Sequence, residues 1–367
     1  MDSPAAFYRE ASSHHEPQST GTREVFGSLS RACESRGALS MTDRLSEISK
    51  WLEQDLADVE KAISFIGKAG DTSAEKSARH LLDRGGKRLR PICVALASRM
   101  GAGFNEAART FAIAVELVHN ATLLHDDVVD LGDVRRGAPA ARMIYGNAAS
   151  IFGGDWLLVE ALTRIQATGV PGVLERTLAV IREMVIAEAW QLERRGRATA
   201  TAREYFEIAR GKTASLFRFA MFAGARAGGT TDAECAALEE YGSHLGLAFQ
   251  IVDDVLDFDG DGAELGKTLF TDLREGKMTY PLIVAAQKSP AIAPLLEEVC
   301  RTEDGAVPPD LAKRITAVVR ETNATKIALD LAVEMCAEAT QCLSRLPAGR
   351  ARDALAGVAL ATPSRRK

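Results

Sequence analysis

Several features that would assign a protein to a class are missing from this sequence of 367 residues. Basic residues are not in excess: 45 Lys and Arg stand against 50 Asp and Glu, for a net charge of -5. This balance argues against a nucleic-acid binder that relies on a general positive field. No run of 18 apolar residues occurs, because Glu116, His119 and Asn120 interrupt the most apolar stretch, so a membrane span is not expected. Residues 1–40 contain no apolar central run, so the sequence does not predict a signal peptide.

Cysteine pairs are also absent. The six cysteines are scattered, with no C-x-x-C pair and no zinc-like spacing: Cys33, Cys93, Cys235, Cys300, Cys336 and Cys342. We therefore expect reduced thiols, most of them in the core, and a cytoplasmic protein.

Proline is missing from the whole segment 172–280, where Ala, Leu, Glu and Arg dominate. No strand alternation bounded by turn signals is found, and clusters of Gly and Pro mark short loops between long helical patterns. The sequence predicts one all-α domain over 41–360, after a disordered extension at 1–40 and before a frayed basic tail at 361–367. Met41, which opens the first patterned segment, is an alternative start of the protein.

Two acidic motifs stand inside otherwise apolar helical segments. Each has the pattern D-D-x-x-D, and their carboxylates belong to Asp126, Asp127, Asp130, Asp253, Asp254 and Asp257. At 3.6 residues per turn, the first and last carboxylates of a motif lie about 40° apart on one helix face. Carboxylates this close repel one another by roughly 1 kcal/mol in water, and by more near a low-dielectric surface. Mg²⁺ supplies countercharge and prefers one or two carboxylates together with substrate phosphates. The two motifs therefore predict a Mg²⁺-diphosphate site between two helices.

Basic residues lie beside both motifs. The segment 85–91 reads G-G-K-R-L-R-P and places cations just before an expected helix. Arg135 and Arg136 follow the first motif, where their guanidinium groups suit phosphate recognition. Around the second motif lie Lys212, Thr213, Lys267 and Lys277.

Two G-K-T strings, at 211–213 and 266–268, raise the question of a nucleotide-binding loop. Such a loop needs Gly at the positions that Phe206 and Asp261 occupy, and it needs a preceding strand. The sequence meets neither condition, so we reject this interpretation.

Five ordered motifs give the chain a resemblance to the trans-isoprenyl diphosphate synthases, the polyprenyl synthetase family, and to its long-chain members. They are G-G-K-R-L-R-P at 85–91, L-L-H-D-D-V-V-D at 123–130, R-R-G at 135–137, G-K-T at 211–213 and F-Q-I-V-D-D-V-L-D at 249–257. One departure is visible, since family members usually carry Gly where this chain has Phe270. The resemblance implies a single-domain, all-α isoprenoid-synthase bundle around a deep central cavity, usually as a homodimer.

The resemblance also implies a reaction, the condensation of isopentenyl diphosphate with an allylic diphosphate, with about three Mg²⁺ ions in each active site. The metal ligands that it implies are Asp126, Asp130, Asp253 and Asp257, supported by Asp127 and Asp254. Isopentenyl diphosphate would bind Lys87, Arg90, His119 and Arg136. The allylic diphosphate would bind Arg135, Lys212 and Lys267, with Lys277 as a helper. Thr213 and Gln250 would lie beside the allylic carbon chain near the developing cation, and the released diphosphate would take the proton.

Product length depends on the helix that carries the first motif, because the growing chain must extend away from the metal toward the start of that helix. Ala121 lies about 7.5 Å before Asp126 along the helix axis, and Val118 about 12 Å before it. A Phe or Tyr at these positions or at Thr122 would block the tunnel, as in short-chain members of the family. The small side chains favour a long product, of the kind used for quinone side chains. In the alternative, they only permit close helix packing, and another residue stops the chain at the farnesyl or geranylgeranyl length.

Two rival functions remain. Terpene cyclases combine the same fold with an acidic helix motif, but their second metal motif usually contains Asn or Asp, then Ser or Thr, then Glu. A non-catalytic regulatory subunit usually loses acidic motif residues, and this chain keeps all six. The sequence leaves open the allylic primer, a heteromeric partner, the downstream pathway and contact with a membrane surface during product release.

Overall fold

The computed structural model describes residues 41–68, 70–258, 270–302 and 307–364. The extension predicted as disordered, residues 1–40, lies outside the described residues, and so does Lys267. Within them the fold is all-α, which confirms the predicted class.

The described residues of the first half of the chain form eight helices and a small antiparallel hairpin. The helices are α3 (Met41–Trp51), α4 (Glu53–Phe65), α5 (Ser73–Leu82), α6 (Leu89–Ser98), α7 (Glu106–Val129), α8 (Ala141–Tyr145), α9 (Asn147–Thr168) and α10 (Val173–Arg194). The hairpin joins β1 (Val134–Arg135) to β2 (Ala138–Pro139) and pairs Arg135 with Ala138.

In the second half, the part of the chain that the structure describes adds nine α-helices, one π-helical turn and three 3₁₀ turns. The elements are α11 (Ala202–Ala209), the π-helical η1 (Arg210–Ala214), α12 (Ser215–Gly228), α13 (Asp232–Leu256), α14 (Thr271–Arg274), α15 (Tyr280–Lys288), η2 (Pro290–Ile292), α16 (Ala293–Cys300), α17 (Pro309–Glu321), α18 (Ala324–Cys342), η3 (Leu343–Arg345), α19 (Arg350–Ala361) and η4 (Thr362–Ser364).

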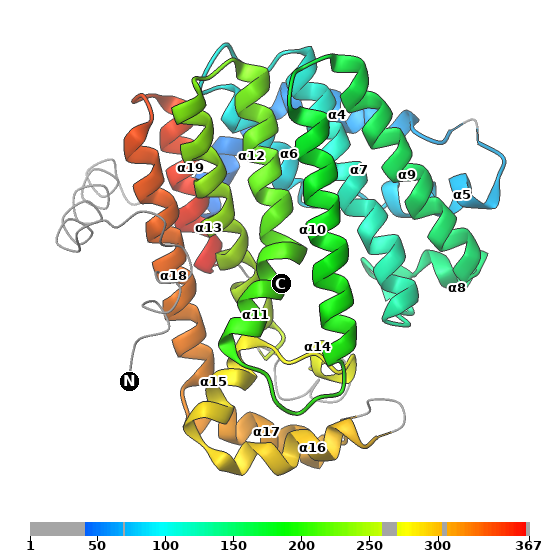
Figure 1. The fold of residues 1–367 in the computed structure, drawn as a ribbon, viewed down its shortest axis with the longest axis vertical. Helices are drawn as coiled ribbons and strands as arrows, with labels where there is room; N and C mark the ends of the chain where they lie inside the picture. Colours follow the sequence, from blue (N-terminus) through cyan, green and yellow to red (C-terminus); the bar gives the residue numbers. More distant parts are fainter. Residues whose placement is uncertain (1–40, 69, 259–269, 303–306, 365–367) are drawn as a thin grey trace.

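The long helices form the body of the bundle (Figure 1). Helix α7 packs against α6, α9 and α12, while α13 packs between α12 and α18. Helices α15, α16 and α17 gather at one end, the lower end in Figure 1. One connected group of buried apolar side chains extends from Ile48 on α3 to Ala359 on α19. Helix α12 thus packs against both α7 and α13, the two helices that carry the acidic motifs.

Local sequence signals explain where α13 begins and how closely it packs. The Thr231 hydroxyl accepts a hydrogen bond from the Glu234 amide, and the Glu234 carboxylate accepts one from the Thr231 amide, so the two residues form a capping box. Farther along, a Cβ on Gly242 would lie 2.8 Å from the Phe217 carbonyl oxygen, and one on Gly246 would lie 2.5 Å from the Ala214 Cα. The two glycines therefore let α13 lie directly against α12 and η1.

The end of the described chain differs from the prediction. We expected residues 361–367 to be frayed, but Ala361 still belongs to α19 and Thr362 is buried in the 3₁₀ turn that follows. The Thr362 hydroxyl donates a hydrogen bond to the Val358 carbonyl, which continues the helix into the turn. Residues 365–367 lie outside the described part. Among the described residues, no helix is both long and apolar enough to span a membrane.

Candidate active site

The first acidic motif lies at the end of α7. Asp126 and Asp127 occupy its last turn, and Asp130 is the C-cap residue. The carboxylate of Asp127 is buried and accepts two hydrogen-bonded contacts from the Arg135 guanidinium, at 2.8 and 2.6 Å. Burial raises the pKa of Asp127, and Arg135 opposes part of that shift. Asp127 therefore fixes the hairpin arginine against α7, while Asp126 and Asp130 contact residues from more distant segments.

Three cations from distant segments meet this motif. The Lys212 ammonium lies 3.8 Å from an Asp126 oxygen, and the Lys277 ammonium lies 2.6 Å from an Asp130 oxygen. The Arg195 guanidinium also binds the Asp130 carboxylate. Burial alone would raise the pKa of Asp130, but Lys277 and the other cations lower it. Asp130 is therefore an ionised carboxylate at neutral pH.

The second acidic motif lies at the end of α13. Asp254 is buried and accepts hydrogen bonds from the Gln250 amide at 2.8 Å and from the Tyr280 backbone amide at 3.0 Å. Burial and the neighbouring Asp272 raise the pKa of Asp254 to about 7. Asp257 accepts a hydrogen bond from the Thr271 amide at 3.2 Å, and Asp253 is half-buried.

Two hydrogen bonds, the π-helical turn and one ion pair connect the two motifs. The Thr213 hydroxyl donates to the Gln250 side-chain oxygen at 2.6 Å, and Gln250 in turn donates to Asp254. Lys212, the residue before Thr213, contacts Asp126. Both residues lie in the π-helical turn η1, an irregularity that often marks functional sites. A Cβ on Gly211 would lie 2.7 Å from the Ala187 Cβ, so glycine is needed where this turn meets α10.

A cavity of about 100 Å³ is bordered by Asp254 of the second motif and by two lysines that contact Asp126 and Asp130 of the first. Its lining includes the two lysines that contact the first motif, and residues of the second motif and the segment after it: Lys212, Lys277, Gln250, Asp254 and Asp272. Acidic and basic side chains from α7, η1, α13 and the segment before α15 thus meet in one place.

A second basic group lies around His119. Arg90, in the first turn of α6, stacks over the Phe217 ring at 4.7 Å. Arg136 donates to the Gly85 carbonyl, so the hairpin is tied to the loop that carries Lys87. Lys87 is exposed and His119 is half-buried. Burial and the arginines around it, Arg90, Arg136, Arg135 and Arg88, hold the pKa of His119 well below its usual range. Of the four residues predicted for isopentenyl diphosphate, Arg90 and Arg136 therefore surround a neutral His119 imidazole, and Lys87 lies on the loop that Arg136 contacts.

The three positions proposed to control product length lie on α7 before the acidic motif. Val118 and Ala121 are fully buried. Thr122 is half-buried, and its hydroxyl donates to the His119 carbonyl at 2.8 Å.

Phe270, which stands where members of the resembling family usually carry Gly, lies just before α14. Phe270 has φ 63°, in the left-handed region that favours glycine. Its ring is nonetheless buried and meets Phe258 edge-on, with centroids 5.3 Å apart. This backbone conformation fits the Gly that the resembling family carries at this position.

Sequence reasoning missed several residues of the site. Lys212 also contacts Glu188 at 2.6 Å and Gln191 at 2.9 Å, both on α10. Lys277 contacts Glu275 at 2.6 Å. Glu188 and Gln191 are three residues apart, and this spacing places them on one face of a helix. Spacing was the only available signal, since their partner lies in a different helix.

Comparison with known proteins agrees with this geometry. The family model described as Polyprenyl synthetase matches residues 71–317. The chain belongs to the polyprenyl synthetase family. It is therefore a prenyltransferase, as the resemblance predicted.

Individual relatives cover most of this polyprenyl synthetase. An octaprenyl diphosphate synthase from Escherichia coli is 37% identical over 66% of the chain and 75% of its own length. A protein named heptaprenyl diphosphate synthase component 2, from Geobacillus stearothermophilus, is 32% identical over 86% of the chain and 98% of its own length. A polyprenyl synthase from Caulobacter crescentus, solved with calcium and isoprenyl diphosphate, has a TM-score of 0.80 and 36% identity, covering 89% of this chain and 98% of that one.

Proposed function

We propose that this polyprenyl synthetase condenses isopentenyl diphosphate with an allylic diphosphate and releases a long-chain polyprenyl diphosphate. The observation that carries the proposal is the shared cavity, where Lys212 and Lys277 contact the first acidic motif and line the same space as Gln250 and Asp254. A diphosphate is the ligand class that suits paired lysines beside several carboxylates, provided that a divalent cation is also bound.

The donor set fits Mg²⁺. Asp126, Asp130, Asp253 and Asp257 would hold it, because they offer hard oxygen ligands at the ends of two helices, beside the lysines and Asp254 that line the cavity. The lowered pKa of Asp130 keeps that ligand ionised. When bound, Mg²⁺ supplies Lewis-acid stabilisation of the charge that develops on the leaving diphosphate.

The chain's own cations bind and orient the allylic diphosphate. Lys212 and Lys277 hold its phosphates at the metal end, with Lys267 proposed as a third contact from outside the described residues. Arg135, held by Asp127 of the first acidic motif, is proposed as a further contact. These charges stabilise the leaving group as the carbon–oxygen bond breaks.

The uncharged polar residues of the site face the carbon end of the substrate. The Thr213 hydroxyl donates to Gln250, and the Gln250 amide donates to Asp254, so Asp254 fixes the orientation of both side chains. They stabilise the allylic cation without supplying a nucleophile that would trap it.

The basic region around His119 holds the second substrate. Lys87, Arg90 and Arg136 bind the isopentenyl diphosphate group, and the neutral His119 imidazole contributes a hydrogen bond. The double bond of this substrate attacks the allylic cation. The released diphosphate then takes the proton, as the resemblance to the family implies.

Product length is supported by the small side chains of Val118, Ala121 and Thr122 and by the octaprenyl and heptaprenyl names of relatives. The test is a Mg²⁺-dependent assay with labelled isopentenyl diphosphate and allylic primers of several lengths. Labelled polyprenyl diphosphate of long chain length supports the proposal. Hydrocarbon released from farnesyl diphosphate alone would identify a cyclase instead.

A second copy of this chain is the proposed partner. Exposed apolar side chains follow one stripe along α10 at seven-residue spacing, Leu178, Val185 and Leu192, and two more lie seven residues apart on α9, Phe152 and Val159. Such a stripe on neighbouring helices is typical of a buried interface.

A different protein is the alternative occupant of this surface, because one relative is named as a component. Activity of the purified chain alone, at a mass of two chains, supports the homodimer, and activity only after a partner is added supports the alternative. We also propose the cytoplasm as its compartment, since the described cysteines are free thiols.

A further inference from the structure

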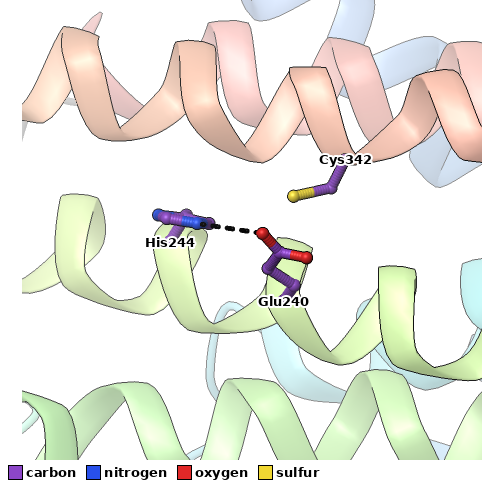
Figure 2. A group of neighbouring side chains, drawn as sticks. All are labelled: Glu240, His244 and Cys342. Atoms are coloured by element: carbon purple, nitrogen blue, oxygen red, sulfur yellow. Dashed lines mark ion pairs between the residues drawn. The ribbon is translucent and has the colours of Figure 1, made fainter. Parts of the chain in front are cut away.

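A group of metal-ligating side chains lies outside the active site, between α13 and α18 (Figure 2). Glu240 and His244 are one turn apart on α13, and Cys342 is the last residue of α18. One ligand atom from each of these three residues lies within 4.8 Å of the other two. The His244 Nε2 atom and the Glu240 carboxylate are 4.0 Å apart. Imidazole, thiol and carboxylate thus converge on one point.

A carboxylate lies behind the imidazole. The other ring nitrogen of His244, Nδ1, lies 3.1 Å from a Glu338 oxygen, one turn before Cys342 on α18. Histidines that bind metals usually direct their second ring nitrogen to a carboxylate, which fixes the ring and raises the basicity of the ligand nitrogen. Glu338 therefore leaves Nε2 directed toward Glu240 and Cys342.

We propose that Glu240, His244 and Cys342 form a binding site for one Zn²⁺ ion. A thiolate, an imidazole and a carboxylate are ligands that Zn²⁺ accepts together, with water in the fourth position. Tetrahedral bonds of about 2.0–2.3 Å place ligand atoms roughly 3.3–3.7 Å apart, so the group closes by about 1 Å when the ion binds. Glu240 supplies that movement, because its side chain is 50% exposed.

Arg345 forms an ion pair with one of the three proposed ligands. Its guanidinium binds the Glu240 carboxylate and is itself 51% exposed, so it can turn into solvent when a cation takes its place. Arg345 therefore competes with the metal. Its removal is expected to strengthen binding.

Binding releases one proton. The Cys342 thiol donates to the Glu338 carbonyl at 3.3 Å, and burial together with Glu240 raises the pKa of Cys342 to about 12. The sulfur–hydrogen bond breaks, the sulfur–zinc bond forms, and the proton leaves to solvent. The charged groups that face the thiol are Glu240 and His244 from α13, Glu338 from α18 and Arg345 from η3.

The site connects α13 to α18 at a distance from the catalytic metal. Nine residues separate His244 from Asp253, which is about 13 Å along the α13 axis. A bound ion holds two of the long helices together and stabilises the helix that carries the second acidic motif. We therefore assign this site a structural role, separate from the proposed Mg²⁺ site at the acidic motifs.

The experiment uses the full chain with Co²⁺ as a spectroscopic substitute for Zn²⁺, in excess Mg²⁺ and inorganic diphosphate so that the acidic motifs are saturated. We expect a thiolate-to-cobalt charge-transfer band with one equivalent of Co²⁺, displaced by one equivalent of Zn²⁺. Cys342→Ser abolishes the band, whereas Cys300→Ser, a matched cysteine change on α16, keeps it. Glu338→Gln weakens binding about 10- to 100-fold, and Arg345→Gln strengthens it.

Three results would overturn the site: no charge-transfer band in the wild type, a band that survives in Cys342→Ser, or a band lost in Cys300→Ser. If Cys342→Ser does not fold, as judged by circular dichroism, His244→Gln takes its place and must lose the band. Because Glu338→Gln and Arg345→Gln change affinity in opposite directions, a general loss of folding cannot imitate the expected pattern.

Discussion

The ammonium group of Lys277 lies 2.6 Å from a carboxylate oxygen of Asp130, although 147 residues separate the two in the sequence. Burial alone would lower the pKa of Lys277, but the carboxylates of Glu275 and Asp130 outweigh it and raise the pKa. The lysine therefore keeps its charge inside the cavity. Its contact joins the end of α7 to the segment that follows the second acidic motif, and it holds a fixed cation where we propose that the allylic diphosphate binds.

Replacing this lysine is expected to weaken catalysis far more than folding. Lys277→Met removes a charge that stabilises the leaving diphosphate, so kcat/KM falls by about 10²-fold. Steady-state assays with labelled isopentenyl diphosphate measure the change. Lys288→Met, at an exposed position on α15, is the matched control and keeps wild-type rates. An unchanged kcat/KM in Lys277→Met would contradict the assigned role.

The neutral state of His119 predicts how stability changes with pH. Burial and the charges of Arg90 and Arg136 lower the pKa of His119 in the folded protein, whereas the unfolded chain binds a proton near pH 6.5. The unfolded state therefore binds more protons below pH 6.5, and the contribution of His119 to the free energy of unfolding is lost as the pH falls from that value. Urea unfolding between pH 5 and 8 measures the slope.

Comparison with a variant isolates this histidine. His119→Gln reduces the slope below pH 6.5 and leaves it unchanged above pH 7. Identical slopes for the wild type and His119→Gln would show that His119 is not held neutral.

The elements of this fold that depend on local pattern could be predicted from the sequence. The D-D-x-x-D spacing placed Asp126 and Asp130 on one side of α7, and the absence of proline over 172–280 predicted long helices there. The contacts between helices could not be predicted in this way. Arg195 and Lys277 reach Asp130 from segments 65 and 147 residues away, and periodicity carries no information about such pairs.

The sequence motif at 85–91 also did not reveal which of its basic residues faces the core. In G-G-K-R-L-R-P, three basic residues look alike, but the structure turns Arg88 inward, where it binds Glu60 and the buried Glu116. Arg88 stands at φ 50° just before α6, so a local backbone conformation decides which cation faces the core. The proposed zinc ligands could not be recognised from the sequence for a related reason. Cys342 lies about a hundred residues from Glu240 and His244, without the short spacing that identifies a metal motif.

Product length is expected to respond to bulk on α7. Ala121→Phe and Thr122→Phe place a ring one turn before Asp126, and the growing chain then meets it and leaves early. Thin-layer or mass analysis of the dephosphorylated products measures carbon number. Ala121→Ser, which keeps a small side chain, leaves the product unchanged. A wild-type product spectrum from both Phe variants, with activity retained, would show that the chain follows another route.

Charge on the apolar stripe of α10 is expected to separate the proposed homodimer. Val185 is 62% exposed in the single chain, and Glu at this position would bury an unpaired carboxylate if two copies met there. We therefore expect Val185→Glu to sediment as one chain at concentrations where the wild type sediments as two. Val333→Glu makes the same change at a 41% exposed valine on α18, away from α9 and α10, and keeps the wild-type mass.

Helix α10 also carries Glu188 and Gln191, which hold Lys212. Loss of the second copy is therefore expected to lower kcat as well as the sedimenting mass. If Val185→Glu stays dimeric, or if Val333→Glu dissociates, the interface lies elsewhere.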